Sequence, residues 1–170
     1  MGSGRSGLYS GTHGGSQPEK SKKAEAFQGG RTRDEYSSLA RNPARGTRVD
    51  YKGVKERSIA LDLERQGKIG EVIRDPQPEK GADFIDTSTG QKWDIKSPIS
   101  HPKGHTSVRK GAFNVDKMMA NVKKEISRGN KVILDTRQLT SKDRQAFKDA
   151  IHAEGLDKSV IWYDKKGDKQ

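Results

Sequence analysis

Acidic and basic side chains stand at spacings that suit catalysis in the middle of the chain. Asp94 and Lys96 are two positions apart, and Asp83 precedes them by about a dozen residues. The segment predicts two short strands around a polar turn, and alternate residues of a strand share a face about 6.6 Å apart. Asp94 and Lys96 would therefore face away from a core that Trp93 and Ile95 enter. Two carboxylates can hold a hard divalent cation, and an ammonium can steady or deprotonate an attacking water. These residue types are the minimum for metal-assisted cleavage of a phosphodiester.

A third carboxylate, Glu56, lies in a segment whose hydrophobic spacing predicts a helix over residues 54–67. It precedes the apolar positions of that helix by three, four and seven residues, at Ile59, Ala60 and Leu63. Glu56 would then share the buried face, where a carboxylate is costly unless it is paired or bound to a metal. The alternative is that Glu56 belongs to the first helical turn, where the helix dipole favours an acid.

The elements that must position these groups follow the order α-β-β-β-α-β-α-β. This order predicts an α/β fold with a central mixed sheet flanked by helices. The helices are expected over residues 54–67, 114–127 and about 141–155, and the strands over 69–73, 82–86, 91–95, 131–135 and 159–163.

The first fifty residues have a different composition from the rest of the chain. They are rich in Gly, Ser, Lys, Arg and Thr and poor in large apolar groups. Such a segment buries too little surface to offset its ordering entropy. We expect residues 1–50 to be a flexible basic linker, with one short helical turn near 34–39, and residues 51–170 to form the domain.

The charge of the chain points to an anionic partner. Its formal net charge is +11 and its pI is about 9.8, which suits nucleic acid, an acidic protein or an anionic membrane surface. No amphipathic membrane helix and no run of about 20 apolar residues accompanies the charge, so we expect nucleic acid and no membrane span. The chain has no cysteine, which excludes disulfides, thiolate metal sites and a cysteine nucleophile.

The residues Glu56, Asp83, Asp94 and Lys96 together resemble the PD-(D/E)xK nuclease superfamily, over about residues 54–163. One departure is Ala82, where the family motif has proline. The resemblance implies a restriction-endonuclease-like core that binds Mg²⁺, with Mn²⁺ or Zn²⁺ as alternatives. It implies that Asp83 and Asp94 are metal ligands, that Glu56 is a third ligand or positions the water, and that Lys96 polarises the water.

A second resemblance concerns the arrangement of the chain. A flexible Gly/Ser/Lys-rich lead followed by a small basic domain is similar to the C-terminal toxin domain of contact-dependent growth-inhibition and other polymorphic toxins. This resemblance implies export by a toxin-delivery system, action in the cytoplasm of a target cell, and an acidic immunity protein that neutralises the domain.

The substrate is expected to be DNA, because aromatic residues for stacking single-stranded RNA make up only 6% of the chain. A transfer-RNA-cleaving nuclease of the same fold is the alternative. Two readings without catalysis also stay open: a basic module that binds nucleic acid, in which Asp94 and Lys96 form a simple ion pair, or a domain that binds an acidic protein. The expected contacts to the nucleic-acid backbone are Lys103, Arg109, Lys110 and Lys117.

Overall fold

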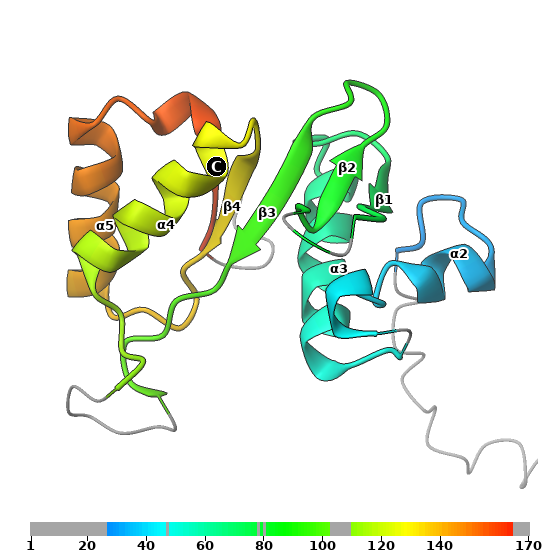
Figure 1. The fold of residues 1–170 in the computed structure, drawn as a ribbon, viewed down its shortest axis with the longest axis horizontal. Helices are drawn as coiled ribbons and strands as arrows, with labels where there is room; N and C mark the ends of the chain where they lie inside the picture. The colour runs from blue at the N-terminus through cyan, green and yellow to red at the C-terminus, as the bar shows by residue number, and fades with distance from the viewer. Residues whose placement is uncertain (1–26, 47, 78, 80, 103–109, 165–170) are drawn as a thin grey trace, which may run out of the picture.

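A mixed five-stranded sheet forms the centre of the protein in the computed structural model, which describes residues 27–46, 48–77, 79, 81–102 and 110–164 (Figure 1). The strand order is β1-β2-β3-β4-β5. The first three strands are antiparallel neighbours, and β3, β4 and β5 run parallel. The predicted α/β class with a mixed sheet is confirmed, and the strand bounds are Val72–Arg74, Phe84–Asp86, Lys92–Lys96, Lys131–Asp135 and Val160–Tyr163.

Helix α3, Tyr51–Arg65, covers one face of the sheet. Its N-terminus is capped by Asp50, whose Oδ1 accepts the backbone N–H of Gly53 at 2.6 Å. The apolar face of α3 packs on strand residues that include Phe84, Trp93 and Ile95. The predicted helix is therefore confirmed, with its start three residues earlier.

Helices α4, Val115–Ser127, and α5, Ser141–Ala153, cover the opposite face (Figure 1). They enclose a second core cluster around Val132, Leu134 and Phe147. A short 3₁₀ helix, η3, spans Asp157–Ser159 and leads into β5. The sheet thus lies between two helical layers, each with its own core.

A buried hydrogen bond joins α3 to the last strand. The Tyr163 hydroxyl donates to Oδ2 of Asp62 at 2.6 Å, and the two residues lie 101 positions apart in sequence. This bond satisfies one oxygen of a buried carboxylate whose other oxygen accepts from Arg65 on the same helix.

The expectation of a flexible linker up to residue 50 is wrong for most of residues 27–50. Helix α2, Arg33–Ser38, occupies the place of the expected helical turn, and a 3₁₀ helix, η1, spans Pro43–Arg45. Leu39 is 2% exposed and belongs to the α3 core. Arg31 forms an ion pair with Glu64 of α3 at 2.7 Å and donates to the carbonyl of Val72 in β1. This segment is therefore part of the domain, while residues 1–26 lie outside the described residues.

No helix in the described part of the chain has the length and apolarity that crossing a bilayer requires. The expectation that the sequence contains no membrane-spanning helix is consistent with this.

Gly53 provides the tightest contact between α3 and the segment before it. A Cβ at this position would stand 2.0 Å from the carbonyl oxygen of Ala40. In an exposed helix interior, Gly→Ala stabilises by about 1 kcal/mol. Here the clash with backbone reverses the sign, and we expect Gly53→Ala to lower the free energy of unfolding by about 1–3 kcal/mol in urea denaturation.

The matched control is Ser58→Ala, an exposed position on the same helix, which should change stability by less than about 0.5 kcal/mol. A Gly53→Ala protein that is as stable as the parent would show that residues 39–40 do not press on α3.

Candidate active site

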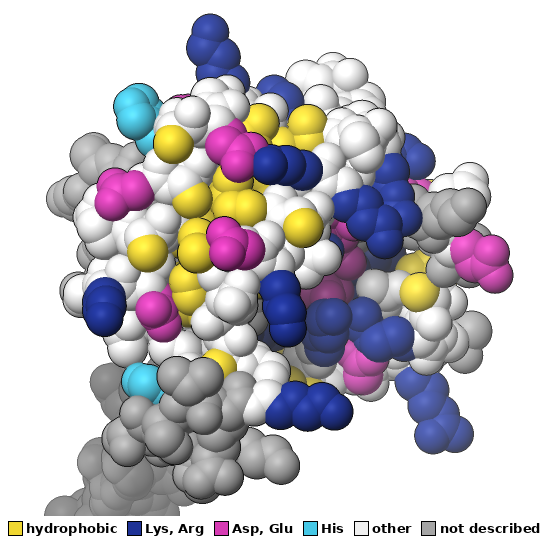
Figure 2. Space-filling view, turned by 60° about the vertical axis from the view of Figure 1, so that its left-hand side comes forward, with side chains coloured by type: hydrophobic (Ala, Val, Ile, Leu, Met, Phe, Trp, Pro, Cys, Tyr) yellow, Lys and Arg dark blue, Asp and Glu magenta, His cyan; other side chains and the backbone are white. Residues whose placement is uncertain are grey.

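Acidic side chains lie at the bottom of a hollow whose rim carries Lys and Arg side chains (Figure 2). Buried carboxylates at positions 56, 83, 94 and 125 are each within ion-pair distance of at least one Lys or Arg. Such an arrangement combines cation-binding groups with an electropositive approach for an anionic chain.

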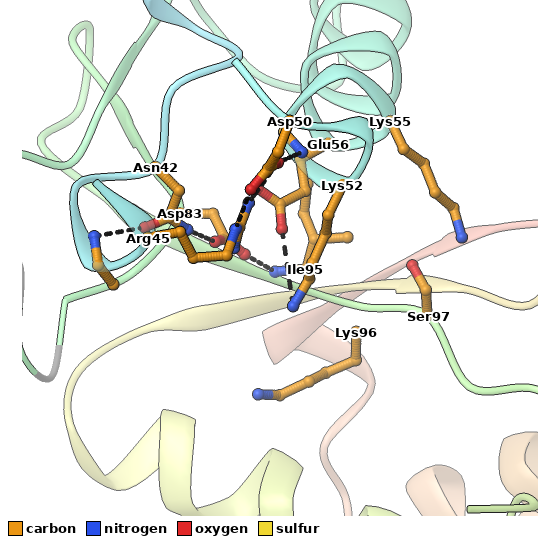
Figure 3. A network of polar contacts seen from close by, with 12 residues as sticks. Asn42, Arg45, Asp50, Lys52, Lys55, Glu56, Asp83, Ile95, Lys96 and Ser97 are labelled. Carbon is orange, nitrogen blue, oxygen red and sulfur yellow. Dashed lines mark hydrogen bonds and ion pairs between the residues drawn. The ribbon is translucent and has the colours of Figure 1, made fainter. Parts of the chain in front are cut away.

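The site forms where strand pairing between β2 and β3 ends. The last paired positions are Phe84 and Trp93, and the N–H of Asp83 still donates to the Trp93 carbonyl at 3.0 Å. One step further, the N–H of Ile95 is bound by the Asp83 carboxylate, through Oδ2 at 2.8 Å, rather than by strand backbone (Figure 3). A side-chain hydrogen bond thus takes the place of a backbone hydrogen bond between the strands, and beyond this point the two strands can separate. We call this place the β2–β3 notch, defined by Asp83, Asp94 and Ile95.

The two faces of the sheet meet at the β2–β3 notch. Asp94 and Lys96 pair in register with Val132 and Leu134, whose side chains belong to the core under α4 and α5. Glu56 comes from α3, which packs on the other face. Asp94 and Lys96 therefore share a face, as strand periodicity predicts, but the helix that carries Glu56 covers the opposite one. Local sequence patterns do not predict this division.

Asp83 is the carboxylate of the site whose charged form is most strongly disfavoured by its surroundings. Its burial, the charge of Asp94 and the charge of Glu56 together raise the pKa of Asp83 to about 7. The Ile95 N–H and Arg74, whose Nη1 is 3.6 Å from Oδ1, oppose this rise without cancelling it. The charge of Asp94 therefore reaches Asp83 and disfavours its charged form, as expected of two ligands of one cation.

Asp94 and Lys96 form a close pair that faces α4. Oδ2 of Asp94 lies 2.9 Å from Nζ of Lys96, and Nζ is also 3.7 Å from Oε1 of Glu125. Burial raises the pKa of Asp94, and Lys96 offsets this only in part. Burial opposes the charge on Lys96 as well, but Asp94 outweighs it and raises the pKa of Lys96. Lys96 is therefore an ammonium at neutral pH, which donates hydrogen bonds and positive charge and does not accept a proton.

Glu56 is held by cations on several sides. Its Oε2 is 2.7 Å from Arg74 Nη2 and 3.4 Å from Arg45 Nη2, while Oε1 is 4.0 Å from Lys52 Nζ (Figure 3). Arg74 also reaches Asp83, so it links the two acids. The expected burial of Glu56 is observed, and a partner accompanies it. In this arrangement Glu56 positions Arg74 and, through it, Asp83. Its expected role as a third ligand or in positioning the water stays a prediction.

Sequence reasoning missed several residues of the site. Arg74 ends β1 and lies next to the prolines of a loop, so no pattern marked it. Asn42, whose Nδ2 donates to Asp83 Oδ1 at 3.4 Å, belongs to the segment expected to be flexible. Glu125 was detectable, because it adjoins the apolar positions Val122 and Ile126 of a predicted helix and is 7% exposed.

The donor set suits a magnesium ion held by few protein ligands. No group of three or more Asp, Glu, His or Cys side chains stands close enough to hold a metal ion within the described residues. Mg²⁺, however, usually keeps several waters and binds through one or two carboxylates and substrate phosphates. Oδ2 of Asp94 is buried, and Nζ of Lys96 lies 2.9 Å from it. A buried carboxylate with a raised pKa, next to a second carboxylate whose pKa is also raised, fits a cation shared by Asp83 and Asp94.

The expected nucleic-acid contacts are only partly described. Lys103 and Arg109 lie outside the described residues. Lys110 and Lys117 are exposed, and Lys117 lies in the first turn of α4. Their role as phosphate contacts stays a prediction.

No family model, no curated protein and no solved structure matches the chain. The chemistry of the site must therefore be argued from its own geometry.

A divalent cation should stabilise the fold through the β2–β3 notch. At pH 8, we expect Mg²⁺ to raise the free energy of unfolding by about 1–3 kcal/mol when it exceeds its Kd by roughly 10- to 100-fold. The measurement is chemical denaturation against NaCl of equal ionic strength. Asp94→Asn should remove the gain, whereas Asp116→Asn, an exposed acid on α4, should keep it.

The stabilisation by Mg²⁺ should be smaller at low pH. The pKa of Asp83 is higher in the folded chain than its ordinary 3.8, so the stability that Asp83 contributes falls as pH rises from about 4 to about 7. A bound cation can offset this loss of stability only at a pH at which Asp83 is charged. A magnesium effect equally large at pH 5 and pH 8 would contradict binding at Asp83.

Proposed function

We propose that this domain is a metal-dependent endonuclease that hydrolyses phosphodiester bonds in nucleic acid, with DNA as the expected substrate and transfer RNA as the alternative. The observation that carries the proposal is the β2–β3 notch, where the charge of Asp94 helps to raise the pKa of Asp83 and Asp94 lies 2.9 Å from the ammonium of Lys96. Two buried carboxylates whose pKa values are raised by burial are costly for folding alone. The same pair next to a charged lysine is useful for stabilising a phosphoryl transition state.

Asp83 and Asp94 would hold Mg²⁺, which when bound supplies a Lewis acid and lowers the pKa of a coordinated water. In the hydrolysis, the water oxygen forms a bond to phosphorus, and the bond from phosphorus to the leaving oxygen breaks. Lys96 adds positive charge where negative charge grows, because the raised pKa keeps it protonated. Glu125 holds its amine at 3.7 Å, on the side away from Glu56.

The arginines of the site have a separate task. Arg74 is nearly buried, with a side-chain exposure of 7%, and is fixed by Glu56 at 2.7 Å. Its second contact, at 3.6 Å, reaches Asp83 Oδ1. Arg74 therefore keeps the Asp83 carboxylate oriented toward the notch, and Oδ2 is held in turn by the Ile95 N–H. Orientation of this kind reduces the reorganisation needed when the substrate binds.

The biological setting is a further part of the proposal. The resemblance to growth-inhibition toxins supports a toxic domain that acts in the cytoplasm of a target cell and is neutralised by an acidic immunity protein. The net charge of +11 suits both an acidic protein and nucleic acid.

Cleavage should depend on the notch and on a divalent cation. We expect the chain to degrade plasmid DNA or total RNA in Mg²⁺ and to leave both intact in a chelator. Asp94→Ala should abolish cleavage, and Lys96→Ala should lower the rate by at least about 100-fold, because each removes charge stabilisation in the transition state. Gel analysis with both nucleic acids and several cations provides the measurement.

Asp116→Ala is the matched control and should cut at the parental rate. Binding of nucleic acid without any degradation would favour the non-catalytic binding module. An Asp94→Ala protein that folds normally by circular dichroism and still cuts in Mg²⁺ would contradict the assignment of the notch as the active site.

Toxicity should follow catalysis. Induced expression of the chain in the bacterial cytoplasm should stop growth, with loss of intact DNA or transfer RNA, because the site needs no further protein to act. The Asp94→Ala chain should allow growth at equal protein levels by immunoblot. Growth that is unaffected by the parental chain at those levels would argue against a toxin.

A further inference from the structure

A second pocket opens beside the β2–β3 notch, beyond the carboxyl ends of β3 and β4. It has a volume of about 450 Å³, within the range of small-molecule sites. One wall is the outer face of α3, and the other is the loop after β4. The lining residues are Tyr51, Val54, Lys55, Ser58, Asp135, Arg137 and Gln138.

The pocket combines an aromatic ring with exposed apolar neighbours. The Tyr51 ring belongs to a residue that is 87% exposed, so its burial contributes almost nothing to the fold. Two other exposed apolar residues, Val49 and Val54, lie within three positions of it. An exposed ring next to apolar side chains can stack on any planar base, because every base has a π-face.

The same pocket carries two cations on one buried acid. Asp135 is 1% exposed, and its carboxylate receives Arg137 Nε at 2.8 Å and Lys55 Nζ at 3.4 Å. Lys55 and Arg137 together carry two positive charges, whereas Asp135 carries one negative charge. Their side chains are 34% and 25% exposed, so donors remain for a solvent-side anion. A phosphate is the anion that such donors bind in a nucleic-acid chain.

The pocket and the notch are linked through the residue that follows β3. Ser97 follows Lys96 in the chain, and its hydroxyl donates to Asp135 Oδ2 at 3.2 Å. Lys52 and Lys55 extend from α3 toward the two sites, Lys52 to Glu56 and Lys55 to the neighbourhood of Ser97 (Figure 3). A polymer that passes from the notch along α3 would therefore reach Tyr51.

We infer that this pocket is a nucleotide subsite, in which an unstacked base lies on Tyr51 and its phosphate binds Lys55 and Arg137. The inference rests on the proposed nuclease function for the polymer's position, and it narrows the substrate class. A base inside an intact duplex cannot enter unless it is flipped out, which costs free energy that an unpaired nucleotide does not spend. The substrate is a strand with unpaired nucleotides next to the scissile bond, as in RNA loops and ends or in single-stranded DNA.

Binding without cleavage tests the subsite. The full chain is titrated in a chelator with fluorescein-labelled 12-nucleotide single strands, RNA and DNA, and with a blunt duplex of the same sequence. Tyr51→Ala should weaken single-strand binding about fivefold or more, the lower end of base–aromatic stacking. Tyr51→Trp should retain binding, and duplex affinity should change by less than about twofold in both variants.

Two further measurements distinguish the contribution of base stacking from that of charge. A 2-aminopurine in the single strand should be quenched on binding to the parent and not to Tyr51→Ala. Lys55→Gln should weaken binding more than Lys142→Gln, a charge-matched change at an exposed position of α5. Tyr51 is so exposed that its variants should fold, and thermal unfolding checks this.

The inference is overturned if Tyr51→Ala binds single strands as the parent does, if it weakens duplex and single strand equally, or if the parent does not bind single strands. Tyr51-dependent single-strand binding without cleavage in Mg²⁺ would support the subsite and remove the nuclease proposal. Cleavage that needs Asp94 but ignores Tyr51 would remove the subsite alone.

Discussion

The hydrogen bond from the Ile95 N–H to the Asp83 carboxylate is the interaction on which the candidate site depends. It ends the β2–β3 ladder with a side chain instead of a paired strand, and it satisfies a backbone donor that would otherwise be buried without a partner. Because the strands can part there, a carboxylate from the α3 face and one from the α4 face come within reach of each other's charge.

The distribution of charge follows from this arrangement. Inside the notch, burial and the charge of Asp94 together disfavour the charged form of Asp83. Around them, guanidinium and ammonium groups such as Arg45, Arg74 and Lys52 neutralise Glu56 and continue the positive surface of the chain. A basic protein can in this way keep a locally anionic centre, which attracts a cation while the surroundings attract a polyanion.

Periodicity and capping made much of the fold predictable. Local sequence patterns predict the helix that begins after Asn114 and the shared face of Asp94 and Lys96. Tertiary contacts do not override these patterns. The packing of residues 27–46 was not predictable, because Arg31 is ordered by Glu64, 33 positions away, and the segment's own composition suggests flexibility. The face on which α3 lies was also hidden, since an amphipathic helix shows which side is apolar and not which side of a sheet receives it. Arg74 escaped for the same reason, as its role comes from partners distant in sequence.

The bond between Tyr163 and Asp62 bears on how the chain reaches its final form. A chain that emerges from the ribosome, or threads through a narrow channel, from its N-terminus presents α3 long before β5. Until β5 docks, Asp62 lacks the Tyr163 hydroxyl that donates to it, and β4 is the exposed edge of the sheet. Strand β5 therefore completes the architecture, and a polypeptide truncated before Val160 would remain an incomplete sheet without the rigid frame that the notch requires.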